Sequence, residues 1–141
     1  MGGYIKNPSY REVCSGRTGH TEAIKITYDK NIISYSQLLE IFFFTHDPTK
    51  LNRQGNDVGT QYRSAVFFEN QSEKKQILES ISIFEKKKIY NDSFVTEVNK
   101  KIEFYDAEIE HHDYYNQNKS QSYCQFVIRP KIKKFENLFN K

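Results

Sequence analysis

The sequence predicts a two-layer fold in which β-strands alternate with α-helices and a helix ends the chain. Residues 23–28 alternate apolar and polar side chains, as a half-buried strand does. Capping signals at Ser34 and Asn70 each precede a segment with helical apolar spacing. A short apolar run at 64–68 lies between these two segments. Strands mixed with helices in this way are typical of one packed α/β-type domain, here residues 1–141.

The first predicted strand, Ala23–Tyr28, carries three apolar side chains on one face: Ile24, Ile26 and Tyr28. A helix is predicted over Tyr35–Thr45, because Ser34 and the glutamine three residues later form a capping box. The residue before a proline avoids the helical region, so the Asp-Pro pair at 47–48 ends this helix. Four side chains should form its buried face: Leu38, Leu39, Phe42 and Phe43.

The second half of the chain contains no glycine after Gly59 and should be mostly regular structure. A strand is predicted over Ser64–Phe68, and a helix runs from the Asn70 cap to about Lys88. Its apolar stripe consists of Ile77, Ile81 and Phe84. A further strand is predicted over Phe94–Val98, and a weakly patterned helix is predicted over 107–118. Pro130 suits the first position of a terminal amphipathic helix with an apolar stripe at Ile132, Phe135 and Leu138.

Composition excludes several classes of protein. The 15% aromatic content argues against disorder, and apolar runs reach only four residues, as at Ile41–Phe44. A membrane helix needs about 20 apolar residues. Residues 1–10 hold no basic stretch followed by an apolar one, so a cytoplasmic protein with no membrane partner is predicted. The pI of 8.7 lies below the value of about 9 typical of nucleic-acid-binding domains, and no such partner is expected.

Two cysteines, Cys14 and Cys124, are too few for a disulfide scaffold. In a reducing compartment such thiols are redox-active, metal-bound or simply buried. The chain has no C-x2-C or H-x3–5-H pairing, so no metal site and no cofactor is predicted. His20 and His46 are expected to hydrogen-bond loop backbone groups instead.

Three polar segments resemble peptide methionine sulfoxide reductase A, a family that reduces the S epimer of methionine sulfoxide and repairs proteins after oxidative stress. Residues 8–22 read PSYREVCSGRTGHTE, against the family's PTYxEVCSGxTGHxE. Residues 46–49 read HDPT, and residues 53–64 read RQGNDVGTQYRS, as in the family. Residues 104–111 read FYDAEIEH, against FYxAExxH. The resemblance covers most of the chain.

The resemblance implies a two-layer α+β core, a mixed sheet with packed helices, that lacks its first strand and helix. The family's nucleophile is the cysteine of a Gly-Cys-Phe-Trp motif on that strand and helix, and this sequence has no such motif and no tryptophan. We therefore expect an N-terminally truncated member that has no nucleophile of its own and is inactive alone. The alternative is a non-catalytic remnant, or one half of a split enzyme, that binds methionine sulfoxide weakly if at all.

The resemblance also assigns site residues. Glu22, Tyr10 and Tyr62 would bind the sulfoxide oxygen, and Asp57 would hold polar groups of the substrate or an ordered water. A partly buried carboxyl group tends to a raised pKa and can donate a proton, and phenols can hydrogen-bond a polarised oxygen. The substrates would be methionine sulfoxide, free or in proteins, and the reductant would be thioredoxin or another dithiol.

Cys124 aligns with the family's recycling cysteine, which condenses with a sulfenic acid to form a disulfide. Its flank, Ser122-Tyr123-Cys124, corresponds to Gly-Tyr-Cys in the family, but the chain continues into a predicted helix instead of a glycine-rich tail. The alternative for Cys124 is a half-buried structural role. Cys14 matches a family cysteine regarded as non-catalytic, and a structural role is expected for it.

The missing strand lies inside the sheet in this family, so its absence should leave two strand edges unpaired and one face bare. The bared side chains would belong to a small set: Ile24, Ile26, Ala65 or Phe67. Exposed edges promote aggregation. The isolated chain is therefore expected to be marginally stable, molten or prone to aggregate.

Overall fold

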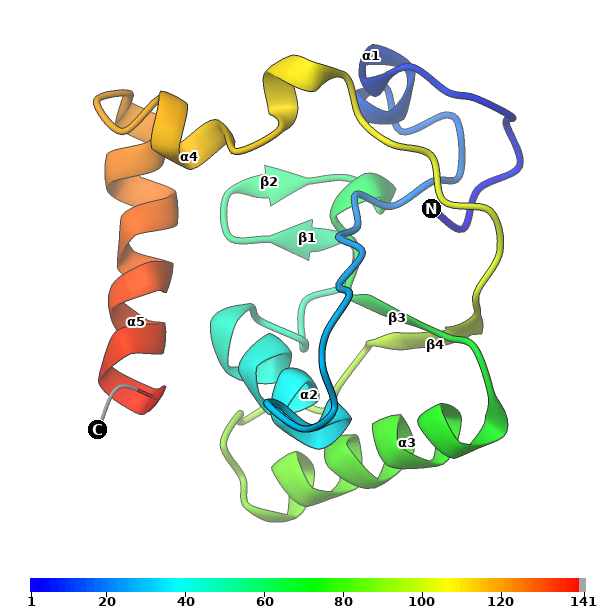
Figure 1. The fold of residues 1–141 in the computed structure, drawn as a ribbon, viewed down its shortest axis with the longest axis vertical. Helices are drawn as coiled ribbons and strands as arrows, with labels where there is room; N and C mark the ends of the chain where they lie inside the picture. The colour runs from blue at the N-terminus through cyan, green and yellow to red at the C-terminus, as the bar shows by residue number, and fades with distance from the viewer. Residues whose placement is uncertain (140–141) are drawn as a thin grey trace.

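A computed structural model describes the backbone of residues 1–139 and the side chains of residues 1–137 (Figure 1). In chain order the elements are α1 (Tyr10–Cys14), α2 (Tyr35–Thr45), β1 (Arg53–Gln54), β2 (Asp57–Val58), the 3-10 turn η1 (Thr60–Tyr62), β3 (Ala65–Phe68), α3 (Gln71–Lys86), β4 (Glu97–Lys100), the 3-10 turn η2 (Ile109–His111), α4 (Tyr114–Gln117), the π-helical turn η3 (Cys124–Ile128) and α5 (Arg129–Phe139).

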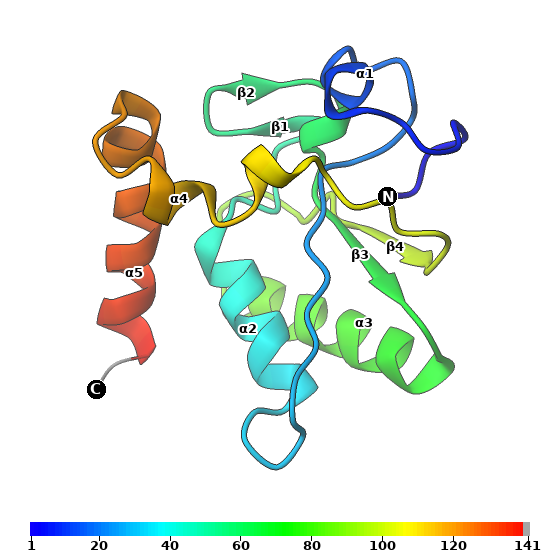
Figure 2. The same cartoon turned by 45° about the horizontal axis from the view of Figure 1, so that its top comes forward.

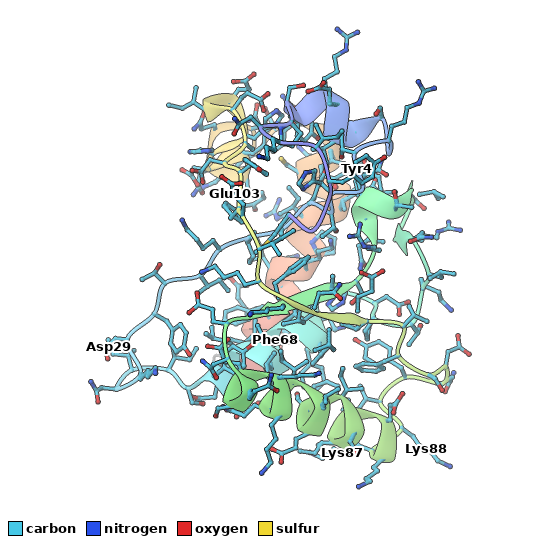
Figure 3. All side chains as sticks on the ribbon, turned by 90° about the vertical axis from the view of Figure 1, so that its right-hand side faces the viewer. Tyr4, Asp29, Phe68, Lys87, Lys88 and Glu103 are labelled. Carbon is cyan, nitrogen blue, oxygen red and sulfur yellow. The ribbon has the colours of Figure 1, made fainter. Side chains whose placement is uncertain are left out.

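The core lies between the β3–β4 pair and the helices α2 and α3, which pack side by side (Figures 1 and 2). Five buried side chains form it: Leu39, Phe43, Phe68, Ile77 and Phe84. Phe68 comes from β3 and lies where the strand approaches α3 (Figure 3). The β3–β4 pair on one side and α2 and α3 on the other confirm the predicted two-layer α+β arrangement.

Both predicted capping signals start helices. The Ser34 hydroxyl accepts from the Gln37 amide at 3.2 Å, and the Gln37 side chain accepts from the Ser34 amide at 2.9 Å. The Asn70 side chain caps α3 by accepting from the Glu73 amide at 3.0 Å. The α2 range is confirmed, and α3 ends at Lys86. Of the predicted core residues of α2, Leu39 and Phe43 are buried, whereas Leu38 and Phe42 are half-buried.

The sheet is smaller than the mixed sheet expected from the sequence. Residues 1–139 hold a parallel pair, β3–β4, and an antiparallel pair, β1–β2. The strand predicted at Phe94–Val98 begins three residues later, at Glu97, which pairs with Ala65. Phe94 instead packs its ring on Phe43, with centroids 5.2 Å apart. Burial in the aromatic core therefore takes residue 94 out of the ladder.

The strand predicted at Ala23–Tyr28 is wrong, because this segment joins neither ladder. It runs past α2 without pairing with β3, as Figure 2 shows. Ile24 is 81% exposed and Ile26 is 52% exposed. The alternating pattern gives the segment a strand-like sequence, but a strand also needs a hydrogen-bonded partner, and the described residues supply none here.

The helix predicted over 107–118 is also wrong. Two short turns, η2 and α4, replace it, because Asp113 adopts a left-handed conformation (φ 48°) that interrupts any continuous helix. The terminal helix is present, but Pro130 is its second residue and not its start, since η3 runs directly into α5. The wide π-turn precedes a proline whose missing N–H breaks the regular hydrogen-bond ladder. Ile132 and Phe135 are half-buried, and Leu138 lies outside the described side chains.

His46 connects the end of α2 to β3. Its Nδ1 lies 2.6 Å from the Phe42 carbonyl oxygen, and its Nε2 lies 2.7 Å from the Ser64 hydroxyl. A carbonyl only accepts, so Nδ1 carries the proton, and Nε2 of the neutral ring accepts from Ser64. Burial lowers the pKa of His46, which keeps the ring neutral. The prediction that His46 hydrogen-bonds backbone groups is confirmed by its contact with the Phe42 carbonyl.

We expect the free energy of unfolding to fall as the pH drops through the usual pKa of histidine, about 6.5. Below that pH the unfolded chain binds a proton that His46 in the folded chain resists, because its pKa is lowered. Replacing His46 by Leu should cost about 1–3 kcal/mol from two lost hydrogen bonds and remove part of the pH slope. Urea unfolding at several pH values measures both effects. The control is His112→Leu, since His112 is exposed. An unchanged pH slope in His46→Leu would contradict the assignment.

Within residues 1–139, no helix is both long enough and apolar enough to span a bilayer.

Candidate active site

Tyr10 is held by residues almost a hundred positions away in the sequence. It is the first residue of α1, whose start is a capping box formed by Ser9 and Glu12. The Tyr10 amide donates to both carboxylate oxygens of Glu108, at 3.0 and 3.3 Å. Its ring stacks on the imidazole of His111, with centroids 3.8 Å apart. The turn at 108–111 therefore fixes both the backbone and the ring of Tyr10.

Glu22 is positioned by hydrogen bonds between its segment and η1. The Glu22 amide donates to the Gln61 carbonyl at 2.9 Å, and the Thr21 hydroxyl donates to the same oxygen at 3.0 Å. The Arg63 guanidinium donates to the Gly19 carbonyl at 3.1 Å. Because Gln61 immediately precedes Tyr62, these bonds bring Glu22 and Tyr62 together.

Asp57 projects from the β1–β2 hairpin. The hairpin turns at Gly55, whose φ of +60° favours glycine, and Gln54 pairs with Asp57 across it. The Asp57 carboxylate accepts from the Tyr123 hydroxyl at 3.1 Å. This bond brings the segment that contains Cys124 to the hairpin.

The four residues predicted from the resemblance are electrostatic neighbours. Desolvation of the carboxyl group raises the pKa of Glu22, although the residue as a whole is exposed, and the Asp57 charge raises it further. Burial, followed by the Glu22 charge, raises the pKa of Tyr62. For Tyr10 the largest cause of a raised pKa is a hydrogen bond with the Cys14 side chain, followed by burial and the Glu22 charge. Both phenols therefore remain protonated donors at neutral pH.

The arrangement gathers proton donors around one place. A carboxyl group with a raised pKa holds its proton to higher pH than an ordinary glutamate. Beside it, the phenols of Tyr10 and Tyr62 can donate hydrogen bonds to an oxygen atom. Such a set suits a substrate whose oxygen becomes more basic and accepts a proton during the reaction.

The two thiols differ in how far they are exposed to solvent. Cys14 is half-buried at the end of α1, next to Tyr10. Cys124 is 0% exposed within the π-turn η3, one residue after Tyr123. Cys124 therefore follows directly after a residue that contacts Asp57, but its side chain is not accessible to solvent in this conformation. No group of three His, Cys, Asp or Glu side chains in the described residues has the geometry of a metal site.

Sequence reasoning missed three residues that shape the site. Tyr123 appeared only as the flank of Cys124, yet burial and the neighbouring Asp57 charge raise its pKa to about 12. Glu108 and His111 appeared only as letters of the FYDAEIEH motif, although they hold Tyr10. The motif marked the segment, but only the fold reveals which distant residue it contacts. His20 behaves as predicted, with its ring nitrogens bonded to backbone groups of Gly3 and Ile5.

Comparison with known protein families identifies the family of this chain. A family model described as peptide methionine sulfoxide reductase matches residues 1–141. The chain belongs to the peptide methionine sulfoxide reductase family. A relative from Saccharolobus solfataricus, named peptide methionine sulfoxide reductase MsrA, is 51% identical over 138 residues, which are 98% of this chain and 77% of the relative. One from Leptospira borgpetersenii with the same name is 50% identical over 133 residues, 94% of this chain and 74% of the relative.

Two solved structures have the same fold as this chain. Methionine sulfoxide reductase A of Corynebacterium diphtheriae superposes with a TM-score of 0.78 at 35% identity, covering 84% of this chain and 61% of that one. Reduced Mxr1 from Saccharomyces cerevisiae gives 0.77 at 33% identity, covering 83% and 64%. The chain thus spans about three quarters of the length of these curated relatives and less than two thirds of the length of these two solved chains.

Proposed function

We propose that this chain forms the oxygen-binding and proton-donating part of a peptide methionine (S)-sulfoxide reductase. The observation that carries the proposal is that these side chains act electrostatically on one centre: the Asp57 charge raises the pKa of Glu22, and the Glu22 charge raises the pKa values of Tyr10 and Tyr62. This supports a role for all four in one site. The substrate class is methionine sulfoxide, free or within proteins, as the names of the relatives suggest.

In the proposed reaction a thiolate attacks the sulfur of the sulfoxide, while Glu22 donates a proton to the oxygen. Tyr10 and Tyr62 hydrogen-bond that oxygen as negative charge develops on it. The oxygen passes from the substrate sulfur to the cysteine sulfur, and the sulfur–sulfur bond formed by the attack breaks with its electron pair going to the substrate. The substrate is thereby reduced by two electrons and leaves as methionine, and the attacking cysteine is oxidised by two electrons to a sulfenic acid. A second thiol then forms a disulfide with it and releases water.

The attacking thiol is proposed to come from a Gly-Cys-Phe-Trp segment that is not part of this sequence. Cys124 is the proposed second thiol, and because it is buried, η3 must open before Cys124 can react. Thioredoxin or a similar dithiol would then reduce the disulfide, and this chemistry suits a protein of the reducing cytoplasm.

The test is a reductase assay with dithiothreitol on the two epimers of N-acetylmethionine sulfoxide. The chain alone is expected to give no turnover. Addition of a synthetic peptide that spans the Gly-Cys-Phe-Trp strand and helix should produce reduction of the S epimer. The same peptide with serine in place of its cysteine is the matched control and should stay inactive.

Two outcomes would contradict the proposal. Turnover by the chain without the peptide would place the nucleophile within the chain, and the variants Cys14→Ser and Cys124→Ser would then identify it. Failure of the S epimer to perturb the NMR signals of Tyr10 and Tyr62, with or without peptide, would remove the oxygen-binding role itself.

A further inference from the structure

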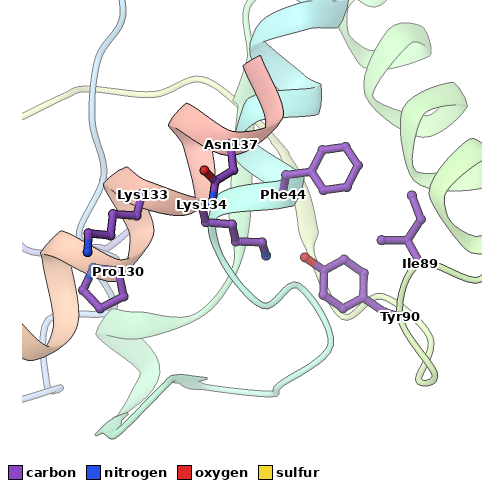
Figure 4. A pocket seen from close by; sticks show the side chains of 7 residues that line it. All are labelled: Phe44, Ile89, Tyr90, Pro130, Lys133, Lys134 and Asn137. Atoms are coloured by element: carbon purple, nitrogen blue, oxygen red, sulfur yellow. The ribbon is translucent and has the colours of Figure 1, made fainter. Parts of the chain in front are cut away.

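A groove separates α5 from the ends of α2 and α3, and none of the candidate active-site residues lines it. Its volume is about 610 Å³, within the range of about 300–1,000 Å³ found for ligand sites. Four side chains give it an apolar lining: Phe44, Ile89, Tyr90 and Pro130 (Figure 4). Three polar side chains from α5 complete it: Lys133, Lys134 and Asn137. These seven residues are called the α5 groove below.

The α5 groove is positively charged and has no acidic lining residue. Lys134 extends from α5 toward Tyr90 (Figure 4). Among the residues that the structure describes, no ion pair involves Lys133 or Lys134. Over Arg129–Asn137 the sequence of α5 has four basic residues and a single acidic one, Glu136. Within the described part of the chain, no carboxylate forms an ion pair with a lysine of the groove.

The positive field extends across the groove to α2. Burial is the main reason for the lowered pKa of His46; the neighbouring Asp47 charge raises this pKa, and the charges of Lys131 and Lys134 lower it. Two ammonium groups of α5 thus act on a residue at the end of α2. A carboxylate placed between α5 and α2 would be attracted by these ammonium groups.

The lining also has polar groups suited to a peptide. The Tyr90 hydroxyl already donates to the carbonyls of Phe43 and His46, so Tyr90 has its ring to offer to an occupant and no free proton to donate. The Asn137 carboxamide can both donate to and accept from a peptide backbone. A segment with apolar side chains next to carboxylates would match this lining better than a simple anion, which could use the lysines but not the apolar surface.

We propose that the α5 groove binds an acidic segment of a partner protein, with an apolar side chain against Phe44, Ile89 and Tyr90 and carboxylates on Lys133 and Lys134. This interaction surface is separate from the proposed reductase chemistry and does not depend on it. Complementary charge at such a surface mainly steers association and sets specificity, so affinity should fall as salt is added.

The probe is a fluorescein-labelled peptide in which Glu alternates with Leu and Phe, followed by fluorescence polarisation with the full chain. The double variant Lys133→Glu/Lys134→Glu should weaken binding about tenfold or more, because two attractions become two repulsions. Ile89→Ser should weaken it through the apolar lining, and Ile89 is partly exposed, so the fold should tolerate the change. Lys30→Glu, in an exposed turn, makes the same kind of charge change outside the groove and should leave binding unchanged.

Three results would overturn the proposal. The first is that the double variant binds the peptide as tightly as the unaltered chain does. The second is that a peptide with Ala in place of Leu and Phe binds as tightly as the original peptide. The third is competition by decanoate at the same concentration as the peptide, which would indicate a site for small amphipathic anions instead. Circular dichroism of each variant shows whether it is folded, and His46 chemical shifts that move with the peptide would place it in the groove.

Discussion

Replacing Glu22 by Gln should lower the rate of sulfoxide reduction about 10²–10⁴-fold, the usual contribution of a positioned general acid. The substituted amide would keep the shape of the side chain and the backbone bond to Gln61 but could not give up a proton. The assay uses the chain supplemented with the Gly-Cys-Phe-Trp peptide. Substrate binding, measured by NMR, should change far less than the rate, because the phenols of Tyr10 and Tyr62 remain.

The pH dependence gives a second readout of the same substitution. The raised pKa of Glu22 means that the acid form persists to higher pH than in an ordinary glutamate and is then lost as the pH rises. The alkaline decline of the rate should therefore be present in the unaltered chain and absent in Glu22→Gln. Glu40→Gln, on the exposed side of α2, is the control and should retain both rate and pH profile. A rate within threefold of the unaltered chain would exclude Glu22 as the proton donor.

The isolated chain should unfold with low stability, or behave as a molten or aggregating species. Ile24 and Ile26 are exposed, and β3 has a single hydrogen-bonded neighbour, β4, among the described strands. Uncovering about 300 Å² of apolar surface removes about 7 kcal/mol, which is comparable with the whole stability of a typical domain, about 5–15 kcal/mol. Unpaired strand edges add a tendency to aggregate.

A peptide that spans the strand and helix of the family's nucleophile segment should rescue the chain. Pairing with β3 and with 23–28 would cover the exposed isoleucines and raise the unfolding temperature, whereas a scrambled peptide of the same composition should not. Thermal unfolding followed by circular dichroism, together with binding of a hydrophobic dye, provides the measurement. A soluble monomer with a sharp cooperative transition above about 55 °C without peptide would show the expectation to be wrong.

Sequence patterns predicted the elements whose signals are local. The capping box at Ser34 and the N-cap at Asn70 specify where α2 and α3 begin, because both partners of each hydrogen bond lie within four residues. The same Ser-x-x-Glu pattern at Ser9 caps α1, which could have been predicted from it. Strand positions depend on a partner elsewhere in the chain, so the pattern at 23–28 gave a strand that does not form.

The site residues could be predicted only through the family resemblance. Glu22, taken alone, is one of many surface carboxylates, and nothing local connects it to Asp57 or Tyr62. Their proximity depends on tertiary hydrogen bonds, such as that from Glu22 to the Gln61 carbonyl. The bond from Tyr123 to Asp57 spans 66 positions and has no signature in either segment.

The contacts of the core and of the site also differ in how they are distributed along the chain. The side chains of the core come from residues between Tyr35 and Val98, so each core contact spans fewer positions than the two site contacts below. The site instead joins Tyr10 to Glu108 and Asp57 to Tyr123, across 98 and 66 positions. Closing longer loops costs more conformational entropy and delays such contacts during folding. We therefore expect the contacts that hold Tyr10 and Asp57 to form later during folding than the contacts between α2 and α3, and to be lost earlier when stability declines.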